Sequence, residues 1–216
     1  VITLKDNAGL DVIKNKATSC NSRLILAEEL DAEPSEVALK GLWQRRNLSL
    51  VKAGLALLRE SGVNIPVEAE KRGLRYVKWR GRFEYIEEEN LLIDSAHNPP
   101  GAKVLRESLD EYFPDNGRVF VYSSLNTKDF RTVSKILFRR DDVVIVTCNT
   151  GHACESPDVI ASFLRKNRLC REVYSTGHVL EAMELSRKLR NNNDLTVFTG
   201  SIYTIGEFLA AKDESR

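Results

Sequence analysis

Short, uninterrupted hydrophobic runs alternate with helical patterns through the second half of the chain. Such runs, rich in β-branched residues and bounded by polar turns, are typical of strands that are covered on both faces. From about residue 118 onward they predict strands at Arg118–Ser123, Asp142–Thr147, Glu172–Ser175 and Asp194–Thr199. Leu91–Asp94 is predicted to be a fifth strand and Phe83–Ile86 a sixth.

Between these runs, apolar residues recur with the 3.6-residue period of amphipathic helices. The predicted apolar faces are Ala102, Leu105, Leu109 and Tyr112, then Val159, Ile160, Phe163 and Leu164, then Val179, Ala182 and Met183. Alternation of strands with helices favours βαβ units. We therefore predict an α/β fold with a mostly parallel sheet and helices on both faces.

The first part of the chain has a different pattern. It contains a predicted helix at Leu10–Ser19, a short apolar run at Arg23–Leu26 and an acidic stretch up to Glu36, and we expect residues 1–40 to be the tail of a preceding domain. An amphipathic helix is predicted within Asn47–Glu60, and residues 41–73 would form a bridging helical segment. Residues 74–216 would then be the main domain.

The composition is that of an ordinary globular protein. Hydrophobic residues make up 42% of the 216 residues and charged residues 29%. The 32 Lys and Arg nearly balance the 31 Asp and Glu, and the charges are interspersed, which argues against a nucleic-acid surface and favours small polar ligands. No run approaches the ~20 apolar residues of a membrane span and no signal-peptide pattern is visible, so we expect a cytosolic protein without membrane contact.

The four cysteines have no spacing that indicates a shared role. Cys20, Cys148, Cys154 and Cys170 form no CxxC pair and have no paired histidines nearby, so we expect reduced thiols and no metal site. His152 and His178 are interpreted as loop or surface histidines.

Polar residues gather where the predicted strands end, which is where open parallel sheets bind ligands. Asp94 closes one strand and is followed by His97, Asn98 and Pro99. The Asp94 carboxylate could accept two ribose hydroxyls, or it could cap the loop as an Asx turn. His97 precedes a helix N-terminus, a place that favours anions, although a lone histidine is often structural.

Three further turns carry candidate chemistry. Ser201, in Thr199-Gly200-Ser201, offers a hydroxyl at a helix start for a carboxylate or phosphate, or it simply caps the helix. Lys128 and Asp129 could bring charge to the cleft, or they could cap a helix. Arg82, in Trp79-Arg-Gly-Arg82, could clamp a phosphate with bidentate geometry.

Several nucleotide and hydrolase motifs are missing from this sequence. It contains no GxxxxGK[ST], GxGxxG, GxSxG or HExxH. Any nucleotide chemistry must therefore use a phosphate loop from outside these residues.

Five segments, in order, resemble the C-terminal half of the folylpolyglutamate synthase/dihydrofolate synthase family, which belongs to the Mur ligase superfamily. They are Gly41-Leu-Trp-Gln-Arg-Arg-Asn47, Trp79-Arg-Gly-Arg82, Asp94-Ser-Ala-His-Asn-Pro99, Lys128-Asp129 and Thr199-Gly-Ser201. The resemblance covers essentially the whole chain, and the D-x-A-H-N-P turn with the later T-G-S is its most specific part. The chain departs from the family at Trp43, where a histidine is usual.

The resemblance implies an ATP-dependent amide ligase of folate metabolism. A carboxylate would be phosphorylated by ATP to an acyl phosphate, which the amine of L-glutamate attacks. The absent central ATPase domain would hold most of the ATP and Mg²⁺ and would pack against this Rossmann-like, glutamate-binding domain. On this basis Asn47 would contact adenine, Arg82 the ATP phosphates and Asp94 the ribose, while His97 and Ser201 would bind glutamate. Folate or dihydropteroate would be the acceptor.

Two alternatives remain open on the sequence. The chain could come from a Mur-type ligase that acts on cell-wall peptides, although the W-x-G-R motif and the T-G-S ending favour folate. It could also be a non-catalytic binding domain. Without a P-loop we expect these residues alone to have no ligase activity.

Overall fold

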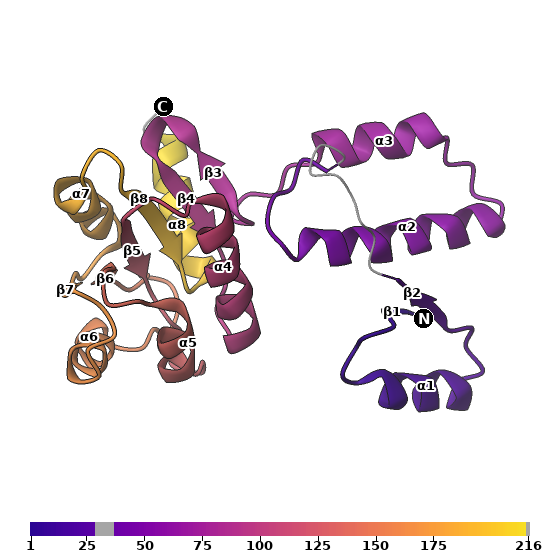
Figure 1. Ribbon diagram of the computed structural model, residues 1–216, viewed down its shortest axis with the longest axis horizontal. Helices are drawn as coiled ribbons and strands as arrows, with labels where there is room; N and C mark the ends of the chain where they lie inside the picture. Colours follow the sequence, from indigo (N-terminus) through magenta and orange to yellow (C-terminus); the bar gives the residue numbers. More distant parts are fainter. Residues whose placement is uncertain (29–36, 215–216) are drawn as a thin grey trace. The chain divides into compact units, whose positions relative to one another are not determined.

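A computed structural model describes residues 1–28 and 37–214 (Figure 1). The chain divides into two compact units, Val1–Lys78 and Trp79–Arg216. The boundary expected between residues 73 and 74 falls inside a helix, Val67–Tyr76, whereas the division follows that helix. Most of the acidic stretch up to Glu36 lies outside the described residues. Among the described helices, none is long and apolar enough to cross a membrane.

The first unit contains a small parallel β-pair and three helices. Strands β1 (Ile2–Leu4) and β2 (Ile25–Ala27) pair in parallel and are connected through α1 (Leu10–Ser19). Helices α2 (Gln44–Glu60) and α3 (Val67–Tyr76) follow. The predicted Leu10–Ser19 helix is confirmed, and the Asn47–Glu60 helix begins three positions earlier, at Gln44.

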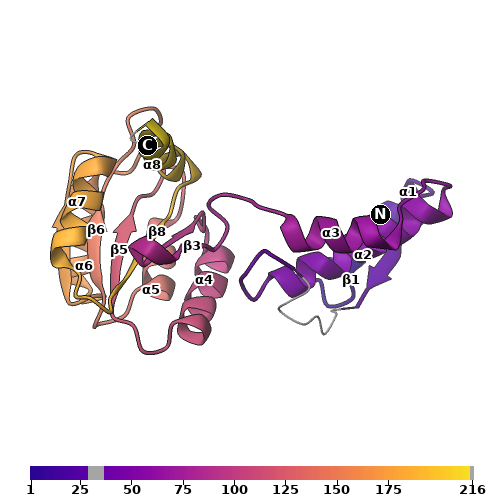
Figure 2. The ribbon, with the colours of Figure 1, turned by 90° about the horizontal axis from the view of Figure 1, so that it is seen from above.

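The second unit is built on a six-stranded sheet with the order β3-β4-β8-β5-β6-β7 (Figures 1 and 2). The strands are β3 (Glu84–Ile86), β4 (Leu91–Asp94), β5 (Arg118–Tyr122), β6 (Val143–Val146), β7 (Glu172–Ser175) and β8 (Leu195–Thr199). All neighbours are parallel except β3, which runs antiparallel to β4 at the edge. All six predicted strands are therefore confirmed. The expected β3 loses Phe83, whose φ of +47° is incompatible with a strand.

Helices cover both faces of this sheet, as predicted. The helices are α4 (Pro99–Tyr112), α5 (Phe130–Leu137), α6 (Pro157–Lys166), α7 (Val179–Leu189) and α8 (Ile202–Glu214), and a short 3₁₀ turn, η1 (Glu87–Glu89), precedes β4. One core cluster joins Val121 and Ile145 of the strands to Met183 of α7 and Phe208 of α8. Phe120 of β5 is outside this cluster and packs edge-on against Phe138, the residue directly after α5.

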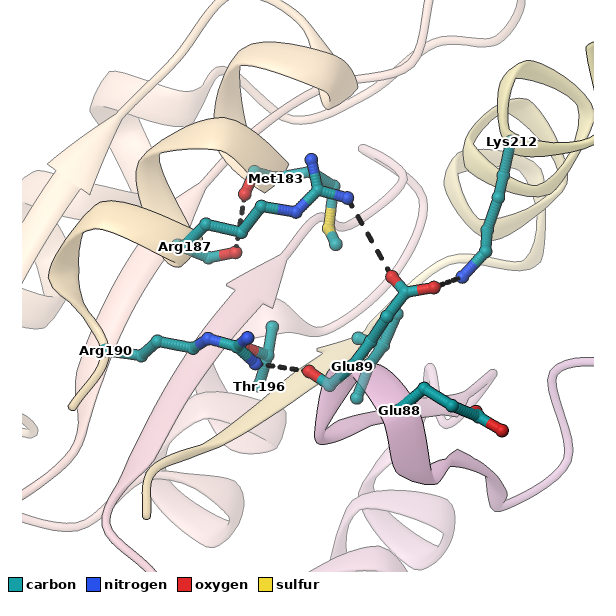
Figure 3. A pocket seen from close by; sticks show the side chains of 9 residues that line it. Glu88, Glu89, Met183, Arg187, Arg190, Thr196 and Lys212 are labelled. Atoms are coloured by element: carbon teal, nitrogen blue, oxygen red, sulfur yellow. Dashed lines mark hydrogen bonds and ion pairs between the residues drawn. The ribbon is translucent and has the colours of Figure 1, made fainter. Parts of the chain in front are cut away.

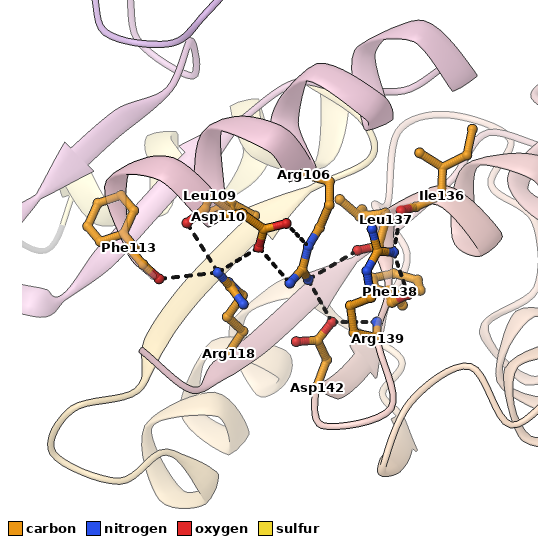
Figure 4. Close-up of polar contacts among 10 residues, drawn as sticks. All are labelled: Arg106, Leu109, Asp110, Phe113, Arg118, Ile136, Leu137, Phe138, Arg139 and Asp142. Carbon is orange, nitrogen blue, oxygen red and sulfur yellow. Dashed lines mark hydrogen bonds and ion pairs between the residues drawn. The ribbon is translucent and has the colours of Figure 1, made fainter. Parts of the chain in front are cut away.

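An ion-pair network that is buried except at Asp110 lies at the amino ends of β5 and β6 (Figure 4). Arg106 of α4 donates to Asp142, just before β6, at 3.1 Å and to Asp110 at 2.8 Å, and Arg118 at the start of β5 donates to the same Asp110 at 3.0 Å. Burial raises the pKa of Asp142 in spite of the attraction of Arg106. These ion pairs compensate the charges that become buried when α4 packs on the sheet, so we interpret the network as structural.

Candidate functional site

The insertion of β8 between β4 and β5 sets the location of the candidate site. The chain runs outward through β4, β5, β6 and β7 and then returns to place β8 between the first two. The register pairs Asp94 with Thr199, so the turns after β4 and β8 leave the sheet side by side. A reversal of strand order at the carboxyl ends is where open α/β sheets form a ligand crevice.

Asp94 is a buried anchor between two turns. Asp94 is 3% exposed. Its two carboxylate oxygens accept hydrogen bonds from the backbone N–H groups of Phe83 and Ala96, each at 2.9 Å. Burial raises the pKa of Asp94 to about 6, against the effect of these two hydrogen bonds and of nearby Arg82. The Asx-type interaction considered from the sequence is present, and a ribose would have to use the remaining lone pairs.

The turn that carries Arg82 is held against the Asp94–His97 turn. The carbonyl oxygen of Gly81 accepts a hydrogen bond from the backbone N–H of Ser95 at 3.0 Å. Phe83, which has a positive φ, donates its backbone N–H to the Asp94 carboxylate. Phe83 is buried while Arg82 between these two anchored residues is exposed. The guanidinium is therefore presented at the surface from a fixed backbone, which suits contact with an anionic ligand.

His97 is half-buried and oriented by its own turn. Its Nδ1 lies 2.8 Å from the carbonyl oxygen of Ser95. Because a carbonyl only accepts, Nδ1 carries the proton in this arrangement and Nε2 is the nitrogen left for a ligand. The neutral ring would accept there, for instance from an amine, and the protonated ring would donate to a carboxylate. Asn98 then caps α4 by accepting from Gly101 N–H.

The Thr199-Gly200-Ser201 turn begins α8 and leaves one hydroxyl unused. Gly200 has a φ of +105°, and a Cβ there would lie 2.0 Å from the carbonyl oxygen of Ser123. Thr199 donates its hydroxyl to the carbonyl oxygen of Ala96, which ties this turn to the Asp94 turn. Ser201 is 2% exposed, and its hydroxyl has no hydrogen-bond partner among residues 1–28 and 37–214. Simple side-chain capping of α8 by Ser201 is thus not observed.

The other predicted site residues make local contacts of their own. Asp129 caps α5 by accepting from Thr132 N–H at 3.1 Å, and Lys128 beside it is exposed, so the capping alternative describes Asp129. Asn47 lies on α2 of the first unit, where it donates to Gln44. In the described residues, no three His, Cys, Asp or Glu side chains are grouped so that they could hold a metal ion.

The expectation that all cysteines are reduced is wrong for two of them. Cys148 and Cys154 are joined by a disulfide, with Cα atoms 5.8 Å apart, because the loop after β6 folds back and Cys154 bridges to Leu125. Cys20 and Cys170 are free. The disulfide closes a loop that contains Asn149, whose side-chain amide donates a hydrogen bond to Thr204 in the first turn of α8.

Sequence reasoning missed the polar chain beneath this loop. The Ser123 hydroxyl donates to Thr204 at 2.7 Å, and Asn149 donates to the same oxygen at 3.3 Å. Ser123 and Asn149 lie where predicted strands end, but neither was selected as a site residue. No local pattern pointed to Thr204, because its contacts with Ser123 and Asn149 depend on the strand order.

The close approach at Gly200 gives a stability prediction with a matched control. We expect Gly200→Ala to lower the free energy of unfolding by more than about 1 kcal/mol, because both its positive φ and the Ser123 carbonyl oppose a side chain. Gly206→Ala, in the interior of α8 with no atom within 4 Å of the added Cβ, should instead stabilise by about 0.5–1 kcal/mol. Urea unfolding of both variants measures this, and equal effects would contradict the geometry.

The raised pKa of Asp94 gives a pH prediction. An acid whose folded-state pKa, about 6, exceeds its ordinary value of 3.8 binds its proton more tightly when folded. Its contribution to stability is therefore complete below about pH 4 and is lost as the pH rises through 6. The wild type should lose roughly 3 kcal/mol relative to Asp94→Asn across this window. Unfolding of both proteins at several pH values tests this, and a constant difference would exclude it.

Known proteins share the sequence pattern and the fold of this chain. Residues 81–202 match the family model described as Mur ligase, glutamate ligase domain. A curated relative from Haloferax volcanii, a probable bifunctional folylpolyglutamate synthase/dihydropteroate synthase, is 32% identical over 83% of this chain and 21% of its own length.

Solved structures show the same fold. Mycobacterium tuberculosis folylpolyglutamate synthase complexed with ADP has a TM-score of 0.83 at 20% identity, over 94% of this chain and 52% of that one. A bifunctional folylpolyglutamate synthase/dihydrofolate synthase from Yersinia pestis, complexed with AMPPNP and Mn ion, has a TM-score of 0.76 at 21% identity, over 94% of this chain and 50% of that one. The chain thus spans about half the length of these structures and less of the curated relative. It belongs to the Mur ligase family, as a C-terminal glutamate ligase domain with the preceding segment.

Proposed function

We propose that the Trp79–Arg216 unit is the glutamate-binding part of a cytoplasmic, ATP-dependent ligase that adds L-glutamate to a folate or to dihydropteroate. The observation that carries this proposal is the buried, unpartnered hydroxyl of Ser201 at the start of α8, beside the His97 turn. A buried hydroxyl without a partner is costly, and a ligand carboxylate at the helix N-terminus would satisfy it. Glutamate carries such carboxylates.

Each residue of the site would have a separate task. Ser201 and the free backbone N–H groups of α8 would hold a glutamate carboxylate, and His97 Nε2 would orient the incoming amino acid. Arg82 would face the ATP phosphates, where a guanidinium stabilises the charge that develops during acyl transfer. Asp94 would hold the Arg82 and His97 turns together and would also contact the ribose. Lys128 and Asp129 would lie toward the cleft, and Asn47 would contact adenine.

Bound ATP and Mg²⁺ would supply the phosphoryl group that activates the carboxylate. These groups would be held mainly by an ATPase domain outside the present residues, because the chain has no P-loop. The proposal therefore assigns binding and orientation to this chain and expects no ligase activity from it alone.

The relatives favour folate over the two alternatives. The curated relative and both solved structures named above carry folylpolyglutamate synthase in their names. None of the relatives named above carries a cell-wall ligase in its name. A non-catalytic binding domain would be supported if the gene encoded no GxxxxGK[ST] segment upstream in the same frame.

Calorimetry with L-glutamate tests the site. We expect the chain to bind L-glutamate and both His97→Ala and Ser201→Ala to weaken binding by about tenfold each, the loss of one charge-assisted hydrogen bond. Ser134→Ala removes another fully buried serine hydroxyl, from the interior of α5, and should leave binding unchanged. Equal binding by all four proteins, or none by the wild type, would refute the assignment.

A further inference from the structure

A pocket lies at the amino ends of β4 and β8, whereas the candidate site lies at their carboxyl ends; Figure 3 shows the residues that line the pocket. It has a volume of about 320 Å³. Leu91 at the start of β4 and Thr196 near the start of β8 form its floor, whereas Asp94 and Thr199 end the same two strands. Because β4 and β8 are parallel, the pocket and the candidate site lie at opposite ends of these two strands. The remaining walls come from η1, α7 and α8, through Glu88, Glu89, Met183, Ser186, Arg187, Arg190 and Lys212.

Three cationic side chains from different places in the chain converge on this pocket. Arg187 belongs to the last turn of α7, Arg190 directly follows that helix, and Lys212 is near the end of α8. The described lining also holds two carboxylates, Glu88 and Glu89. Figure 3 shows Arg187 and Lys212 directed at the Glu89 carboxylate from two sides.

Glu89 acts as an internal anion in this arrangement. Its Oε1 accepts from Lys212, its Oε2 lies 3.8 Å from Arg187 Nη2, and its backbone carbonyl accepts from Arg190. The Lys212 side chain is only 12% exposed, so its ammonium requires a negative partner at this point. The geometry therefore selects for an anion, and the chain supplies one from its own short turn.

Glu89 is held by contacts that an external anion could replace. Its pair with Arg187 is long, and the Arg187 side chain is 57% exposed, a combination that contributes little to stability. Glu89 also ends a three-residue 3₁₀ turn, followed by Asn90 in the left-handed conformation. The Glu89 side chain is 31% exposed and so already borders solvent. A ligand with equal or greater negative charge would keep Lys212 paired.

We propose that this pocket is an anion-binding site for a small organic phosphate, whose phosphoryl group displaces the Glu89 carboxylate and binds Arg187, Arg190 and Lys212. A phosphoryl group presents three acceptor oxygens, which suits two guanidinium groups and one ammonium. The volume exceeds the need of a phosphate ion alone, and Met183 and Leu91 offer apolar contact to a short carbon skeleton. The site is independent of the glutamate site proposed above.

Titration calorimetry with glycerol 3-phosphate, on the chain as it stands, tests the proposal. We expect binding by the wild type and tighter binding, by about fivefold, in Glu89→Gln, which keeps the shape of the side chain but removes the competing charge. Arg187→Gln should weaken binding by about tenfold, and Lys212→Met by at least as much. Arg187 is exposed enough that its variant should fold even if Lys212→Met does not.

The controls separate this site from general attraction and from the glutamate site. Arg171→Gln removes an exposed arginine that pairs with Glu172 outside the pocket, and it should leave phosphate binding unchanged. Ser201→Ala should also bind glycerol 3-phosphate normally, whatever its effect on glutamate. Absence of binding in both the wild type and Glu89→Gln would overturn the proposal. Binding that Arg187→Gln does not weaken, or that Arg171→Gln weakens equally, would overturn it as well.

Discussion

The parallel pairing of β4 with β8 is the constraint on which the rest of the site depends. These strands are far apart in the sequence, yet their register aligns Asp94 with Thr199 and so brings two polar turns together. Gly200 permits the second turn to pass close to the Ser123 carbonyl, and the Thr199 hydroxyl binds the first turn through Ala96. A one-residue change of register would move every one of these contacts to the wrong face.

Polar side chains are paired differently at the amino and carboxyl ends of the strands. At the amino ends of β5 and β6, Arg106, Arg118, Asp110 and Asp142 form ion pairs with one another, as Figure 4 shows, although Arg118 Nε has no hydrogen-bond partner among the described residues. At the carboxyl ends, the Ser201 hydroxyl has no hydrogen-bond partner among the described residues. Folding alone explains the first arrangement. The second costs stability, and a ligand that forms a hydrogen bond with the Ser201 hydroxyl would recover that cost.

Local patterns predicted most of the elements because each depends on nearby residues. The bounds of β4, β7 and the Leu10–Ser19 helix were predicted to the residue, since the hydrophobic period and the flanking turns determine them. The sequence also selected Asp94, His97 and Ser201 as strand-end residues. Their proximity required the strand order, which no local pattern encodes.

What the sequence could not predict depends on long-range packing. Cys148 and Cys154 pair because their loop returns to Leu125, and their spacing alone is uninformative. The second backbone contact of Asp94, with the N–H of Phe83, forms at a residue with a positive φ, which no propensity favours for an aromatic residue. The pocket of Glu89, Arg187 and Lys212 combines residues that are distant in sequence, and each of them resembles an ordinary surface charge on its own.

The central claim is that the turns after β4 and β8 form one glutamate site. A crystal structure of the chain with L-glutamate tests it most directly. The account predicts a glutamate carboxylate within hydrogen-bond distance of the Ser201 hydroxyl at the N-terminus of α8, with His97 Nε2 facing the amino acid. Glutamate bound elsewhere, with Ser201 still unpartnered, would contradict it.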